Sequence, residues 1–243
     1  MNQAPDFAHI IMIGAMKSAT TTLHQMLIRN PEIVDSVRKE NDFFTGRDDV
    51  ENYPEIFPIE PGVRYTLDSS TNYSKPASAF GLDDHEIPER IARLPRPVKL
   101  IYMMRHPIDR VESHIAHNIR QGRQIGREDQ ILLAIEVSRY ATQLDRYRSF
   151  FEGDRMFLGG FDLFTNDRRA FMRNLYKFID MPPLLEKLTM KRNVGVNREG
   201  LLTGQERRLV AERTLDDTRR LVTDYDFNPA RAWVADLEQT LGE

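Results

Sequence analysis

The chain has 243 residues, a formal net charge of −3 at pH 7 and no cysteine. This length suits one α/β domain with a sizeable core, and the slight negative charge argues against a general nucleic-acid binder. The absence of cysteine excludes disulfides, thiolate metal sites and a cysteine nucleophile. Because the sequence shows neither a signal peptide nor an apolar run of membrane-spanning length, we expect a cytoplasmic protein.

The N-terminal part predicts a buried strand, a small polar turn and a helix. Residues 9–13 are mostly apolar, and an apolar helical face begins at Leu23. The turn between them, residues 14–22, is rich in small and hydroxyl side chains. Its unpaired backbone N–H groups and the helix dipole suit a tetrahedral anion, and Lys17 adds a full positive charge. We call residues 14–22 the anion loop; a plain strand-to-helix turn is the alternative.

Further β-like runs alternate with helical segments along the chain, and this alternation predicts a parallel sheet with helices on both faces. We expect a single domain over residues 1–243, with a helical part from about 200 to 243 packed on it and Trp233 as a buried anchor. The predicted strands are 32–37, 63–67, 97–104 and 155–161. The predicted helices are 86–94, one starting at Pro107, a long one from about Gln130 to Phe151, and one around Phe171 to Phe178.

A second anion site is predicted where the strand 97–104 ends. Arg105 directly follows this strand, where a fixed guanidinium can form two parallel hydrogen bonds to a phosphate. Ser113 lies on the next helix, whose side chains lean toward its N-terminus. Arg105 and Ser113 can therefore reach one anion. The alternative is a surface ion pair for Arg105 and a solvated serine. The same helix carries Ile108, Val111, Ile115 and Ile119 on one side, and residues 120–129 form a polar connection.

Both sites resemble those of sulfotransferases that use 3′-phosphoadenosine 5′-phosphosulfate (PAPS). Lys17 to Thr21 is similar to the family's K-[SG]-G-T-[TS] loop for the 5′-phosphosulfate, with Ala19 in place of glycine. Arg105 to Ser113 matches the 3′-phosphate motif R-x-P-x-x-R-x-x-S at each fixed position. The nucleotide pattern G-x-x-x-x-G-K-[ST] does not fit. The resemblance implies a P-loop-like α/β fold and PAPS as the donor, held on its 5′ side by Lys17, Ser18, Ala19, Thr20, Thr21 and Thr22.

Weaker similarities extend the resemblance over roughly residues 9–235. Lys39-Glu40-x-x-Phe43-Phe44 resembles the K-E-x-x-F-F element of the branch that includes the heparan sulfate enzymes. Residues 68–73 resemble another element of that branch, from which Ser69 and Asn72 depart. Residues 140–147 are similar to the family's Y-x-x-Q-L-x-x-Y helix. Lys191 and Arg192 fall where the family has a basic loop over the cofactor.

The resemblance also implies catalytic roles. Sulfuryl transfer needs a base for the acceptor, stabilisation of the spreading charge and a positive partner for the leaving oxygen. Glu40 is implied as the base, Lys17 as the contact of the bridging oxygen and Lys39 as a second positive contact, with no metal required. Because Asp42 stands where several relatives have histidine, a surface ion pair between Lys39 and Glu40 is the alternative.

Other polar residues are weighed against ordinary structural roles. His114 and His117 have the spacing of two metal ligands, but no third ligand is evident, so we predict no metal site. His106 is interpreted as structural. Arg120, Arg123 and Arg127 are most simply a solvated run, although they could contact an anionic acceptor.

The sequence thus predicts a sulfotransferase that acts on a hydroxyl or amine of a small metabolite or a short glycan. Two rival functions stay open: a nucleotide-dependent phosphotransferase, and an inactive module that binds PAPS or its product 3′-phosphoadenosine 5′-phosphate (PAP). The sequence indicates neither the acceptor nor the oligomeric state.

Overall fold

The computed structural model describes residues 6–37, 39–46, 48–185 and 200–242. Within these residues, five parallel strands form one sheet in the order β2-β3-β1-β4-β5. Ile11 at its centre lies opposite Asp68 of β3 and Leu100 of β4. A parallel sheet covered on both faces needs apolar side chains on both sides, which explains the unbroken apolar runs. The strands are β1 (Ala8–Gly14), β2 (Ile33–Asp35), β3 (Tyr65–Ser69), β4 (Val98–Met104) and β5 (Met156–Gly160).

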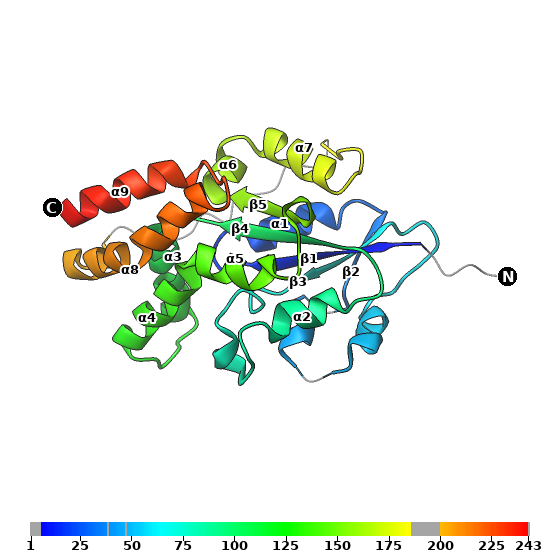
Figure 1. Ribbon diagram of the computed structural model, residues 1–243, viewed down its shortest axis with the longest axis horizontal. Coiled ribbons are helices and arrows are strands. Elements are labelled where there is room, and N and C mark those ends of the chain that lie inside the picture. The colour runs from blue at the N-terminus through cyan, green and yellow to red at the C-terminus, as the bar shows by residue number, and fades with distance from the viewer. Residues whose placement is uncertain (1–5, 38, 47, 186–199, 243) are drawn as a thin grey trace.

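Helices cover both faces of this sheet, as predicted (Figure 1). Alternate residues of β1 point to opposite faces, so Ile10 and Met12 pack into one core and Ile11 and Ile13 into the other. The first core is closed by α1 (Thr20–Leu27), α6 (Phe161–Asn166) and α7 (Arg168–Phe178). The second is closed by α2 (Glu86–Ala92), α5 (Tyr140–Arg148) and the short 3-10 helices η1 (Phe43–Thr45) and η2 (Val50–Ile56).

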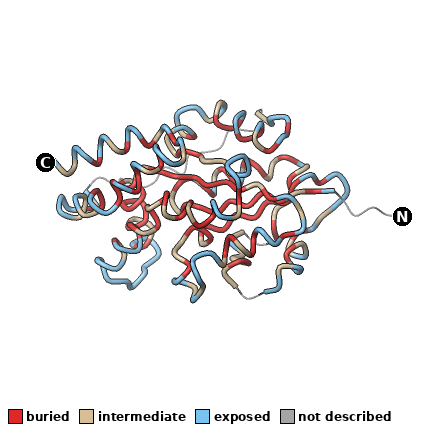
Figure 2. Tube along the Cα trace, viewed as in Figure 1, coloured by how far each residue is buried: buried red, intermediate tan, exposed pale blue. Residues whose placement is uncertain are grey.

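A third apolar cluster joins the helices that lie beyond the carboxyl ends of the strands (Figure 1). The predicted packing of Trp233 is confirmed, since it is 4% exposed. Figure 2 shows buried residues running from the sheet into this helical region. The helices are α3 (Pro107–Arg120), α4 (Arg127–Ser138), α8 (Gly204–Thr223) and α9 (Ala230–Gly242). No helix in the described part of the chain is long and apolar enough to span a membrane.

One prediction about the helices was wrong. The long helix from Gln130 to Phe151 is two helices that meet at Arg139, whose ψ of 73° is not helical. The carboxylate of Asp217 on α8 accepts the backbone N–H groups of Ala141 and Thr142 at 2.9 Å, which satisfies the start of α5. At the end of α3, Ile119 is 60% exposed, whereas Ile108, Val111 and Ile115 are buried.

Candidate functional site

The anion loop has the backbone expected of a tight turn between β1 and α1. Lys17 and Ala19 have φ angles of 72° and 66°, in the left-handed region that favours glycine. Ala19 directly precedes α1, and Ser18 and Thr20 are buried on either side of it. The Ala15 N–H donates to the carbonyl of Met103 at 2.7 Å, which fixes the loop to β4. The residue that replaces the family's glycine thus keeps the conformation that glycine adopts freely.

Arg105 lies at the carboxyl end of β4, the strand beside β1. It is 7% exposed, and its guanidinium stacks on Phe161 at 4.3 Å from the ring centroid. Its Nη2 donates to Asp109 at 3.2 Å, whereas its Nε has no hydrogen-bond partner among the described residues. Ser113 is also buried, on α3. The guanidinium is therefore held by stacking and one exposed carboxylate, which leaves an N–H group for a ligand.

The second arginine of the same motif, Arg110, has a different environment. It is fully buried, and its Nε donates to Ser138 at 2.7 Å. Its other nitrogens donate to the carbonyls of Ala134 and, at 3.4 Å, of Met16 in the anion loop. Burial lowers the pKa of Arg110. Arg110 therefore ties α3 and α4 to the anion loop, a structural role that the sequence did not reveal.

The Y-x-x-Q-L-x-x-Y similarity has a clear physical basis. The Tyr140 hydroxyl donates to the carbonyl of Arg105 at 2.8 Å. About two helical turns later, the Tyr147 hydroxyl donates to the carbonyl of Tyr73 at 2.8 Å. Both tyrosines are fully buried. Helix α5 therefore fixes the backbones of two segments that contain predicted site residues.

Residues 39–42, which we call the Glu40 loop, lie beside the carboxyl end of β3. The Glu40 N–H donates to the carbonyl of Ser69 at 3.2 Å. Glu40 and Asp42 have φ angles of 55° and 56°, an uncommon conformation for such residues. Lys39 and Glu40 form an ion pair at 3.0 Å, with side chains 25% and 51% exposed. The surface ion pair between Lys39 and Glu40, which was the alternative to a catalytic role, is thus present. The Glu40 side chain is nevertheless exposed to solvent.

The two departures in residues 68–73 are both built into polar networks. The Ser69 hydroxyl is hydrogen-bonded to Nδ1 of buried His24 at 2.8 Å, and Nε2 of His24 lies 3.0 Å from Asp35. Asn72 donates to the carboxylate of Asp42 at 2.8 Å. The segment also crosses the end of β1, where the Ser70 N–H donates to the carbonyl of Met12 at 3.1 Å and the Ser74 N–H to that of Ile13 at 3.0 Å.

Two further residues near these loops have shifted pKa values: Lys75, which was not a predicted site residue, and His114, which was considered only as a metal ligand. Burial lowers the pKa of Lys75, an effect that Asp42 opposes. Burial also lowers the pKa of His114 to about 3, helped by Arg110 and Lys75. The Nδ1 atom of His114 has no hydrogen-bond partner in the part of the chain that the structure describes. Lys75 stands two residues after the polar cluster at the end of β3, which was the only sequence signal for it.

The remaining candidates have separate outcomes. Lys191 and Arg192 lie outside the described residues. Arg127 forms an ion pair with Glu206 at 2.6 Å, at the start of α8, so it serves the helical cluster. Arg120 and Arg123 are exposed. No three His, Asp or Glu side chains among the described residues are grouped as a metal site would require.

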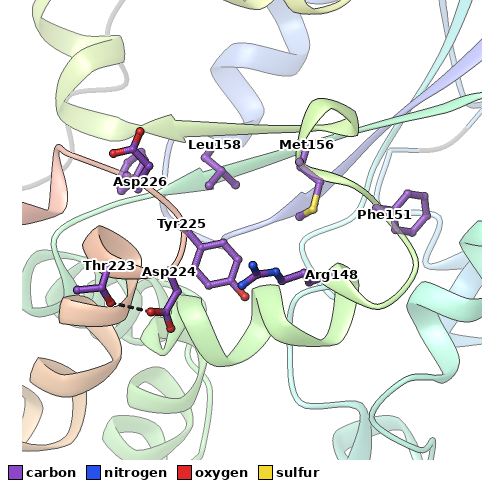
Figure 3. A pocket seen from close by; sticks show the side chains of 10 residues that line it. Arg148, Phe151, Met156, Leu158, Thr223, Asp224, Tyr225 and Asp226 are labelled. Atoms are coloured by element: carbon purple, nitrogen blue, oxygen red, sulfur yellow. Dashed lines mark hydrogen bonds between the residues drawn. The ribbon is translucent and has the colours of Figure 1, made fainter.

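A cavity of about 520 Å³ lies elsewhere, between the start of β5 and the end of α8 (Figure 3). It is lined by apolar side chains from Met156 and Leu158 and by Arg148, whose guanidinium lies 5.6 Å from the ring centroid of Tyr225. It contains none of the predicted site residues. The candidate site is thus defined by its polar groups at the carboxyl edge of the sheet and not by this cavity.

No family model matches the chain. In sequence it is 24% identical over 227 residues to bifunctional heparan sulfate N-deacetylase/N-sulfotransferase 2 of Bos taurus, covering 81% of this chain and 25% of that protein. It is 21% identical over 200 residues to heparan sulfate glucosamine 3-O-sulfotransferase 5 of Mus musculus, covering 74% and 55%. The chain thus spans about a quarter of the length of the first relative and about half of the length of the second.

Solved structures extend the likeness to the fold. A sulfotransferase from Alicyclobacillus acidocaldarius superposes with a TM-score of 0.72 at 19% identity, covering 94% of this chain and 99% of that one. The chain is related to sulfotransferases. A mouse sulfotransferase complexed with PAP superposes with a TM-score of 0.60 at 13% identity, covering 96% and 89%. The predicted resemblance and the P-loop-like fold of a sulfotransferase are confirmed.

Proposed function

We propose that this sulfotransferase-like chain transfers a sulfuryl group from PAPS to a hydroxyl or amine of a glycan or small-molecule acceptor. One observation carries the proposal: the two candidate anion sites lie directly after the carboxyl ends of two adjacent strands. The anion loop follows β1, and Arg105 follows β4. Arg110 then joins α3 to the anion loop through the carbonyl of Met16. Two anion sites in this arrangement suit a nucleotide with phosphate on both the 5′ and the 3′ oxygen.

The chemistry requires one bond to form and one to break. The acceptor oxygen or nitrogen attacks the sulfur and gives its proton to Glu40, and the bond from sulfur to the 5′-phosphate oxygen breaks. Lys17 would neutralise the charge that develops on the leaving oxygen, with Lys39 as a second positive contact. The 5′-phosphosulfate would lie against residues Ser18, Ala19, Thr20, Thr21 and Thr22. Arg105 and Ser113 would bind the 3′-phosphate, and Lys191 and Arg192 are proposed to cover the cofactor.

The names of the relatives support a carbohydrate acceptor, because both are heparan sulfate enzymes, one an N-sulfotransferase and one an O-sulfotransferase. Both an amine and a hydroxyl therefore stay open as the sulfated group. The cytoplasmic location and the single-domain organisation stay predictions.

Binding of PAP tests the proposal directly. We expect the metal-free protein to bind PAP at least about 10-fold more tightly than ADP, because one charge-assisted phosphate contact contributes about 1.5–3 kcal/mol. Arg105→Ala should remove that preference. The control is Arg96→Ala, since Arg96 also stacks on an aromatic ring, Phe7, at 4.0 Å. Calorimetry measures the Kd values for PAP and ADP in each variant.

Three outcomes separate the rival functions. PAP preference with turnover of PAPS on a panel of glycans and amines supports the proposal. PAP preference without turnover on any acceptor favours the inactive binding module. Equal or tighter binding of ADP, especially with Mg²⁺, would overturn the proposal in favour of a phosphotransferase.

A further inference from the structure

A buried carboxylate, Asp68, lies beneath the Glu40 loop at the end of β3. Its side chain is 0% exposed and accepts hydrogen bonds from three elements. Asn41 of the Glu40 loop donates to Oδ1 at 2.8 Å. The hydroxyl of Tyr73 donates to Oδ2 at 2.8 Å, and that of Tyr53 on η2 donates to the same oxygen at 3.2 Å. Because all three neighbours donate, the site is built for the ionised carboxylate.

Asn41 is the residue through which Asp68 reaches the loop. While its amide nitrogen donates to Asp68, its amide oxygen accepts from the Phe43 N–H at 2.9 Å and lies 3.2 Å from the Tyr73 hydroxyl oxygen. It stands between Glu40 and Asp42, the two residues with left-handed backbone. Such conformations are costly and persist only where the surroundings determine them. The contacts of Asn41 contribute to that determination, together with the hydrogen bonds of the Glu40 N–H to Ser69 and of Asn72 to Asp42.

We propose that Asp68 is a positioning residue for sulfuryl transfer, whose ionised carboxylate holds Asn41 and thereby keeps Glu40 presented to the acceptor. This inference rests on the function proposed above and on Glu40 as the base. Asp68 itself touches no reactant, since it is fully buried below the loop.

Opposing contributions set the pKa of the Asp68 carboxyl group. Burial raises its pKa to about 6 against the hydrogen bonds from Tyr73, Asn41 and Tyr53, and the nearby Asp42 raises it further. Beyond these groups, His9 packs against Tyr53, with ring centroids 5.1 Å apart. Burial lowers the pKa of His9 to about 4. A proton on Asp68 removes acceptor capacity, so the hold on Asn41 weakens as the pH falls through about 6.

Stability and activity then respond to pH in opposite directions. The pKa of Asp68 in the folded state lies above its unfolded value of 3.8. The folded protein therefore binds the extra proton between about pH 4 and 6, and the contribution of this group to stability falls as the pH rises through that range. Activity should rise over the same range. A residue with only a structural role would not separate the two quantities.

The decisive variant is Asp68→Asn, which keeps the shape and removes the charge. We expect kcat for sulfuryl transfer to fall about 10- to 100-fold, as for a displaced catalytic group, and the loss of activity near pH 6 to disappear. The Kd for PAP should stay within about twofold, since none of the three hydrogen bonds that Asp68 accepts comes from the anion loop. The matched control is Thr66→Val on the same face of β3, which removes an equally buried hydrogen bond, 2.6 Å long, to His9. It should leave kcat and the pH profile unchanged.

A second variant tests the charge without touching Asn41. Tyr53→Phe removes a donor that lowers the pKa of Asp68. The acid limb of kcat should move to higher pH. An unchanged limb in both Tyr53→Phe and Asp68→Asn would overturn the proposal.

Amide hydrogen exchange keeps the test independent of turnover. In the PAP-bound protein, Asp68→Asn should speed exchange of the Glu40 amide, which donates to the carbonyl of Ser69, more than Thr66→Val does. If the wild type turns over no acceptor but the exchange differs as expected, the proposed function fails while the positioning of the loop stands. If exchange is equal in the two variants, the positioning itself is refuted.

Discussion

The two halves of the candidate site are held in different ways. The donor side, which comprises the anion loop with Arg105 and Ser113, is fixed by the strand-to-helix connections themselves and by buried groups such as Arg110. The acceptor side, the Glu40 loop, is held mainly by side-chain hydrogen bonds, from Asn41 to Asp68 and from Asn72 to Asp42, beside one backbone hydrogen bond from Glu40 to Ser69, and Glu40 is half exposed. A backbone-built donor site suits a constant cofactor. An acceptor side that depends on side chains can change its geometry with few substitutions.

The largest expected effect comes from the donor side. Lys17→Ala should lower kcat for transfer by at least about 10³-fold, because a preorganised positive partner for the leaving oxygen is lost. Lys177→Ala, at an exposed position on α7, is the control and should keep wild-type kcat. Single-turnover assays with labelled PAPS measure both. Retained transfer in the Lys17 variant would show that the anion loop does not serve the leaving group.

Arg110→Met probes the framework of the donor side. Removing this fully buried guanidinium takes one hydrogen-bond donor from Ser138 and from the carbonyls of Met16 and Ala134, of which the Ala134 carbonyl keeps the Ser138 hydroxyl as a donor. We expect the free energy of unfolding to fall by about 2–4 kcal/mol, since each buried unsatisfied polar group costs about 1–3 kcal/mol. Urea titration measures it. Arg120→Met, at the exposed end of the same helix, should stay within about 0.5 kcal/mol of wild type. An equal effect of the two substitutions would show that α3 does not depend on this contact.

The same contrast explains what the sequence could predict. The anion loop, Arg105 and Ser113 were accessible because strand, turn and helix follow one another in the chain, so local patterns fix their direction. The break at Arg139 was missed because its stabilising partner, Asp217, comes from α8. The link between Asn41 and Asp68 was missed for the same reason, since it joins residues 27 positions apart. The exposure of Ile119 could not be predicted, because periodicity does not show where a helix loses its neighbours.

The smallest expected effect concerns Ala19, the one departure within the anion loop. Its φ of 66° carries a steric cost of about 1–2 kcal/mol for a residue with a Cβ atom. Glycine removes this cost but adds about 0.4–1 kcal/mol of unfolded-state entropy. Ala19→Gly should therefore raise the free energy of unfolding by up to about 1.5 kcal/mol.

The matched control for this change is Ala235→Gly, at an exposed position inside α9. It should lower the free energy of unfolding by about 0.5–1 kcal/mol, because glycine is unfavourable in a helix. Opposite signs for the two substitutions, measured by urea titration, would identify backbone strain in the loop. A loss of stability in both would mean that Ala19 is relaxed. In that case the anion loop would carry no backbone strain at Ala19. Left-handed strain would then distinguish the Glu40 loop, at Glu40 and Asp42, from this part of the donor side.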